Sequence, residues 1–134
     1  MAIMSLGRCN GRRNEGRKRR PRIDSTSFGS IKIDGKTYES DVMVTWMGKV
    51  KEAQTEVRHF IGEADFLKLL FERPDVVVVG TGQQGCMEVG EGVRRFAKDK
   101  KIRLVAKPTP EAARKFNQLA ASGKHVVAYM HVTC

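Results

Sequence analysis

The sequence predicts a single α/β domain with a three-layer α/β/α arrangement around a mixed, partly parallel sheet, and a β-hairpin near its N-terminus. Residues 76–79 are four consecutive valines, which is typical of a parallel strand covered on both faces. Apolar runs of this kind alternate with helical patterns through the second half. An Asp-Gly pair, Asp34-Gly35, lies between alternating residues near the start. A chain of 134 residues fits one domain of this class.

The first half of the domain reads as β-structure. Residues 31–33 and 36–38 flank Asp34-Gly35, and such a pair favours a two-residue type I′ hairpin because both turn positions need a positive φ. Residues 42–45 predict a further strand. Residues 46–54 mix glycine, lysine and isolated apolar residues, so we expect a loop, followed by a short strand over residues 55–60.

Helical spacing begins at Glu63 and continues until Pro74, which must end the helix. After the valine strand and a glycine-rich turn, apolar residues recur at helical spacing on one face. They are Val89, Val93, Phe96 and Ala97.

The last three elements are a strand, a helix and a strand. Residues 102–105 predict the first strand. The hydroxyl of Thr109 and the ring of Pro110 are typical of an N-cap and a first helical position, and Gly123 is typical of a C′ residue. Residues 126–131 are nearly all apolar, which indicates a central strand.

Charge divides the chain into a basic tail and a nearly balanced domain. The whole chain carries +10, and residues 1–22 hold eight Lys or Arg and one Glu, a net +7. Residues 23–134 hold 17 basic and 14 acidic residues, a net +3. We therefore predict a disordered tail over residues 1–22 and a folded domain over residues 28–134. No aromatic residue precedes Phe28, so any nucleic acid would bind through the tail by charge alone.

The three cysteines, Cys9, Cys86 and Cys134, show no C-x-x-C spacing. Their odd number and spacing indicate neither a disulfide framework nor a zinc site, which favours a reducing cytoplasm. No apolar run reaches the roughly 20 residues of a membrane span, and residues 1–6 are too short for a signal-peptide core. The expected location is cytoplasmic.

A glycine-rich turn is the candidate site. Gly80, Thr81, Gly82, Gln83, Gln84 and Gly85 match G-x-G-x-x-G between a buried strand and an amphipathic helix, as in dinucleotide-binding folds. The acidic ribose ligand expected after the next strand is missing, since residues 106–108 are Ala-Lys-Pro. Two interpretations remain. In the first, the backbone N–H groups of the turn, together with Lys107 and Thr109, bind an anionic ligand or a partner. In the second, the glycines only permit a tight turn.

Other side chains offer little chemistry. Cys86 at a helix start has the position of an activated thiol, but no base is adjacent, so a space-filling role is the favoured alternative. Strand alternation disfavours a dyad of His131 and Cys134, and His59 reads as a surface or satisfied polar residue. The three histidines have no metal-ligand spacing. We therefore expect no metal and no cofactor, and catalysis is the less favoured interpretation.

Several motifs resemble one known family. These are FGSIKIDG at residues 28–35, DVVVVGTG at 75–82, residues 112–119 with Phe116-Asn117, and HVTC at 131–134. They are similar to the Mth domain, which occurs in archaeal and bacterial proteins of unknown activity, in an adipogenesis-associated protein and in a mitochondrial complex I assembly factor. The resemblance implies a compact α/β/α domain without assigned catalytic residues. This chain differs in having Gly90 where members often have proline.

Together these observations favour a non-catalytic binding or assembly-accessory module that uses the glycine turn and the neighbouring loop. Its contact is a protein partner or a small anionic ligand. The alternatives are a small enzyme or cofactor-binding protein that uses the same turn, and sequence-independent nucleic-acid binding by the tail.

Overall fold

The computed structural model describes residues 20–134 and is organised by a five-stranded mixed sheet in the order β11-β9-β12-β6-β7. The first three strands, β11 (Arg103–Lys107), β9 (Val76–Thr81) and β12 (Val126–His131), are parallel. Strands β6 (Val42–Thr45) and β7 (Val50–Glu52) continue the sheet antiparallel. The predicted mixed, partly parallel sheet is therefore confirmed.

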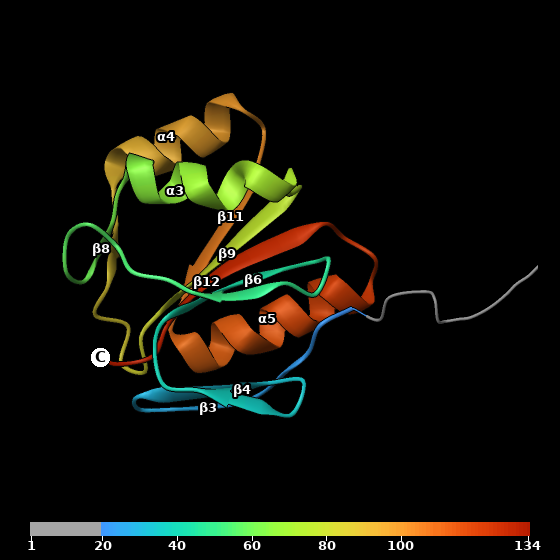
Figure 1. Cartoon of the computed structure of the whole chain (residues 1–134). Helices are drawn as coiled ribbons and strands as arrows, with labels where there is room; N and C mark the ends of the chain where they lie inside the picture. Colours follow the sequence, from blue (N-terminus) through green and yellow to red (C-terminus); the bar gives the residue numbers. More distant parts are fainter. Residues whose placement is uncertain (1–19) are drawn as a thin grey trace, which may run out of the picture.

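Helices lie on both faces of this sheet (Figure 1). Helices α3 (Glu63–Leu69) and α4 (Glu91–Asp99) cover one face, and α5 (Thr109–Ala121) covers the other. A 3₁₀ helix, η1 (Leu70–Glu72), extends α3. The α/β/α layering that the sequence predicts is confirmed.

Two smaller sheets complete the fold. Strands β3 (Ile23–Ser27), β4 (Ser30–Ile33) and β5 (Lys36–Tyr38) form an antiparallel sheet on the outer side of α5 (Figure 1). Strands β8 (Phe60–Ile61) and β10 (Glu88–Val89) pair in parallel. Residues 60–61 and 88–89, which precede α3 and α4, are thereby held side by side.

The four valines of β9 separate two apolar cores. Val76 and Val78 pack with α5 and the three-stranded sheet, whereas Val77 and Val79 pack with α3 and α4. Each of the four is at most 4% exposed. Alternation along a strand sends successive side chains to opposite faces, so this strand is buried on both, as predicted.

The predicted hairpin is confirmed, and it is tied to α5. Asp34 and Gly35 have φ values of 49° and 84°, as a type I′ turn requires, and join β4 to β5. The side-chain amide of Asn117 accepts from the Ile23 N–H and donates to the Ile23 carbonyl, both at 2.8 Å. Asn117 thus acts as a strand-like partner for the start of β3.

Four local predictions were wrong. Residues 55–59 form no strand beyond an isolated bridge at Val57, and the strand covers only Phe60–Ile61. The expected loop over residues 46–54 contains β7, an edge strand whose charged residues, Lys51 and Glu52, resemble those of a solvated loop. Helix α4 begins at Glu91, because Val89 lies in β10. Pro108, not Thr109, occupies the N-cap of α5, because the Thr109 hydroxyl bonds elsewhere.

The ordered chain begins before Phe28, since β3 starts at Ile23. The expected disorder and nucleic-acid binding of the basic tail fall mainly on residues 1–19, which lie outside the described residues. Within residues 20–134, no helix is long and apolar enough to cross a membrane.

Candidate functional site

The glycine turn after β9 is covered by the residues that follow β12. The Gln83 N–H donates to the Thr133 carbonyl at 2.7 Å. The N–H groups of Gln84 and Cys86 donate to the main-chain oxygen of Cys134 at 3.3 and 3.0 Å. These three N–H groups, which a bound anion would need, are therefore engaged within the chain.

A disulfide between Cys86 and Cys134 fastens this arrangement, with Cα atoms 5.5 Å apart. The expectation of no disulfide is corrected here. The spacing of the cysteines along the chain could not reveal this pair. The two cysteines meet because β12 lies parallel to β9, so the segments that follow these two strands leave the sheet at the same edge. Disulfides are rare in cytoplasmic proteins, so the cysteines no longer favour that location.

Thr109 is buried beneath the turn. Its hydroxyl accepts the Gly82 N–H at 2.9 Å and donates to the His131 carbonyl at 2.6 Å. Gly80 lies against the same residue, since a β-carbon there would come within 2.9 Å of the Thr109 hydroxyl oxygen. Two of the predicted site residues, Gly80 and Thr109, thus join the ends of β9, β12 and α5 inside the fold.

An open hollow of about 530 Å³ remains on the β11 side of the turn. Four predicted residues line it: Thr81, Gln84, Gly85 and Lys107. Arg94 of α4 adds a second cation, and Glu88 is an acidic neighbour. Gly80, Gly82, Gln83 and Thr109 do not line it. The sequence did not suggest Arg94, because its position beside the same hollow as Lys107 follows only from the packing of α4.

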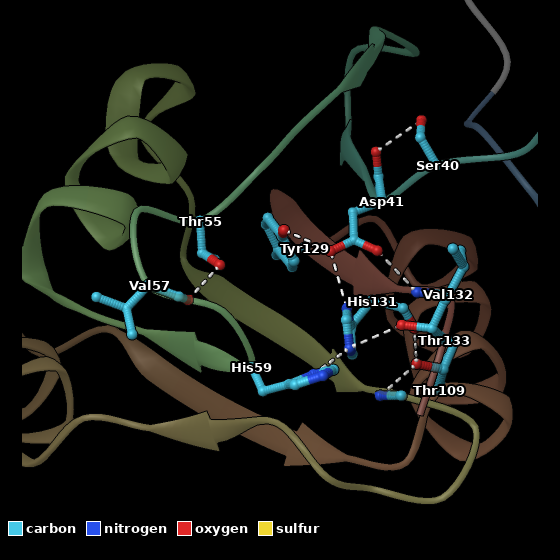
Figure 2. A network of polar contacts seen from close by, with 11 residues as sticks. Ser40, Asp41, Thr55, Val57, His59, Thr109, Tyr129, His131, Val132 and Thr133 are labelled. Carbon is cyan, nitrogen blue, oxygen red and sulfur yellow. Dashed lines mark hydrogen bonds and ion pairs between the residues drawn. The ribbon is translucent and has the colours of Figure 1, made fainter. Parts of the chain in front are cut away.

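A chain of polar side chains lies at the same end of the sheet, next to β12 (Figure 2). One Asp41 oxygen, Oδ2, accepts from Nδ1 of His131 at 2.9 Å and from the Tyr129 hydroxyl at 2.7 Å. The other, Oδ1, accepts the Val132 N–H at 2.9 Å. Nε2 of His131 lies 3.1 Å from Nδ1 of His59. The cluster is therefore carboxylate, imidazole and imidazole in sequence.

The two histidines of this cluster differ in exposure. His131 is 6% exposed, whereas His59 is only partly buried and has a φ of 58°. Burial, followed by the hydrogen bond to Asp41, raises the pKa of Tyr129 far above its ordinary value. Asp41 thus holds a neutral tyrosine and orients a histidine. The hydrogen bonds thus connect the partly buried His59 to the buried His131 and to Asp41.

Sequence reasoning missed this cluster because its members come from three distant segments. Asp41 precedes β6, and His59 follows an irregular loop. A polar residue such as Asp41 is common before a strand, so its position in the sequence does not mark it as functional. The pairing of β6 with β12 brings Asp41 to His131. Within residues 20–134, no group of three or more His, Cys, Asp or Glu residues could hold a metal ion.

Comparison with protein families gives one match over most of the chain. The model of a protein family of unknown function, DUF498/DUF598, matches residues 23–131. The chain belongs to this family. The match begins at β3 and ends with β12, so it spans all three sheets described above and the side chains of the polar cluster.

Solved structures share the fold of this DUF498/DUF598 domain. A conserved hypothetical protein from Pyrococcus horikoshii OT3 has 29% identity and a TM-score of 0.77, over 84% of this chain and 99% of that one. A Bordetella pertussis protein described as an Mth938-like domain has 17% identity and a TM-score of 0.62, over 83% and 85%. A structure described as an outer membrane protein from Bartonella henselae has 22% identity and a TM-score of 0.71, over 87% and 98%. The resemblance to Mth domains is thus confirmed at the level of the family and the fold.

Proposed function

We propose that this chain is a non-catalytic binding module of the assembly-accessory kind, and that it contacts an acidic segment of a protein partner through the hollow beside the glycine turn. The observation that carries this proposal is that Arg94 and Lys107 both line one hollow of about 530 Å³. The sequence resembles the Mth domain, which also occurs in a mitochondrial complex I assembly factor, and this occurrence motivates the proposed role in assembly.

Side chains, not backbone, supply the positive charge in this proposal. The N–H groups of Gln83, Gln84 and Cys86 already bond to residues 133 and 134. Arg94 and Lys107 form no ion pair with any residue between 20 and 134. Guanidinium and ammonium groups both bind carboxylates, and the exposed residues Gln84 and Gly85 line the same hollow.

The test is an NMR titration of the full chain with a short polyglutamate peptide. Amide shifts are expected at Gln84, Gly85, Arg94 and Lys107. The variant Lys107→Gln weakens binding about two- to five-fold, the range of an exposed ion pair. Lys124→Gln, an exposed lysine just before the amino end of β12, is the matched control and leaves affinity unchanged. Shifts confined to other surfaces would refute the proposal.

The alternative is a small anionic ligand in the same hollow, as a cofactor-binding protein would hold. A thermal-shift screen with nucleotides, nicotinamide and flavin cofactors and inorganic pyrophosphate separates the two. A ligand at 100 times its Kd stabilises the fold by about 2.7 kcal/mol. Stabilisation by one of these compounds, with loss in Lys107→Gln, would favour the small ligand over the protein partner.

A further inference from the structure

A second concave site lies on the α3 face of the sheet, over β6 and β7. This pocket has a volume of about 460 Å³, which falls within the range of small-molecule sites. Its floor includes Met43 of β6 and Lys51 of β7, and one wall is formed by α3 and η1. It shares no lining residue with the hollow beside the glycine turn.

The wall of the pocket carries exposed apolar side chains. Leu67 is 51% exposed and Phe71 is 82% exposed. They are four residues apart on α3 and η1, the spacing that places two side chains on one side of a helical segment. Met43, Ala53 and Leu69 extend the apolar lining inward. Apolar side chains gathered at a concavity are typical of a binding site.

The buried polar groups of this pocket are satisfied inside the protein. The Asp65 carboxylate accepts the N–H groups of Glu56 at 3.1 Å and Gly62 at 2.9 Å. The Tyr129 hydroxyl donates to Asp41. A ligand that reaches these walls therefore needs no polar groups along its body.

The charged residues that line the pocket are three lysines, Lys49, Lys51 and Lys68, and three acids, Glu52, Asp65 and Glu72. Lys49 is paired with Glu72 at 3.1 Å. Lys51 and Lys68 also line the pocket, and neither forms an ion pair within residues 20–134. Alternation along β7 places the side chain of Lys51 on one face and that of Glu52 on the other. Two lysines are thus available to an anionic head group.

A second copy of the chain fits this surface poorly. Strand β7 is the edge of the sheet and spans only three residues. Antiparallel pairing of two copies around its middle residue would bring one Lys51 opposite the other, and like charges directly opposite are destabilising.

We propose that this pocket binds an amphipathic carboxylate, a molecule with an unbranched or compact apolar body and one acidic head. The body lies against Met43, Leu67 and Phe71, and the carboxylate lies between Lys51 and Lys68. Neither the fold family nor the proposed partner-binding role assigns a ligand here, and the proposal is independent of both.

The test uses three probes with one chain length and different heads: octanoate, octanol and octylammonium. Binding to the full chain is measured by calorimetry and located by NMR. Octanoate is expected to bind most tightly and octylammonium most weakly. Intermolecular NOEs are expected between the octanoate chain and the methyl groups of Met43, Ala53 and Leu69.

Charge variants separate this site from the overall positive charge of the protein. Lys51→Gln and Lys68→Gln each lower the affinity for octanoate about two- to five-fold and leave the affinity for octanol unchanged. Lys32→Gln, on the exposed side of β4, is the matched control and changes neither. Leu67→Gln, at a half-exposed position, weakens both octanoate and octanol.

Three results would overturn the proposal. They are equal or tighter binding of octylammonium, an absence of NOEs to Met43 and Ala53, and no binding of octanoate at all. Sedimentation analysis supplies a fourth. A dimer of the wild type that Leu67→Gln disperses would assign the surface to a second copy.

Discussion

The main chain of Cys134 lies directly against the α-carbon of Gly82, where any β-carbon would overlap it. Gly82 also has a φ of 109°, a conformation that other residues rarely adopt. The G-x-G-x-x-G pattern is therefore used here to admit the chain's own residues 133 and 134. In a dinucleotide-binding fold, the corresponding close approach is made by a pyrophosphate.

Gly82→Ala is expected to lower the free energy of unfolding by about 2–4 kcal/mol, because it adds both backbone strain and an overlap with Cys134. Gly123→Ala is the matched control. That glycine has a φ of 88° but no atom within 4 Å of an added β-carbon, so strain alone costs about 1 kcal/mol. Urea denaturation measures both. Equal losses would mean that residues 133 and 134 do not occupy the turn.

Cys86→Ser removes the disulfide to Cys134 and is expected to lower the free energy of unfolding by about 2–4 kcal/mol. A thiol reductant should lower the melting temperature of the wild type to about that of Cys86→Ser. The melting temperature of Cys86→Ser itself should not change. Mass spectrometry after alkylation reports the pairing directly. Two alkylated cysteines at positions 86 and 134 of the unreduced protein would contradict the disulfide.

Asp41→Asn keeps the size of the side chain but removes the charge that holds Tyr129 and His131. We expect a loss of about 2–4 kcal/mol, because hydrogen bonds to a partly buried charged group are weakened together. Asp99→Asn, exposed at the end of α4, should change stability by less than about 0.5 kcal/mol. Urea denaturation of both variants distinguishes the cluster from a general effect of removing an acid.

The raised pKa of Tyr129 predicts a loss of stability at alkaline pH. Burial and Asp41 favour the neutral phenol, so the stabilisation is full below the unfolded value of 10.0 and falls as the pH rises above it. Tyr129→Phe should be free of this part of the alkaline loss, as measured by urea denaturation from neutral to alkaline pH. Tyrosinate absorbance that shows both native tyrosines titrating together near their ordinary pKa would contradict the assignment.

Much of the fold follows from local patterns in the sequence. Val76 to Val79, the Asp34-Gly35 turn and Gly123 each impose one structure through burial, positive φ or the end of a helix, and each was predicted. Strand β7 was predicted wrongly as a loop, because the charged residues of an edge strand resemble those of a solvated loop. The strand predicted over residues 55–60 covers only Phe60–Ile61.

The candidate site was harder to predict from the sequence, because its composition depends on which strands are neighbours in the sheet. The glycine turn was recognisable from residues 80–85 alone. Its coverage by Thr133 and Cys134 follows from the position of β12 beside β9, which no local pattern contains. The same holds for Asp41 and His131, which meet because β6 pairs with β12.

The affinity of the double variant Arg94→Gln/Lys107→Gln for an acidic peptide tests the central claim most directly. Calorimetry with polyglutamate at low salt should show a loss of about ten-fold relative to the wild type, since two exposed ion pairs are removed. A double control, Lys32→Gln/Lys124→Gln, carries the same change in net charge at sites outside the hollow and should bind as the wild type does. An equal loss in both double variants would contradict a specific site beside the glycine turn.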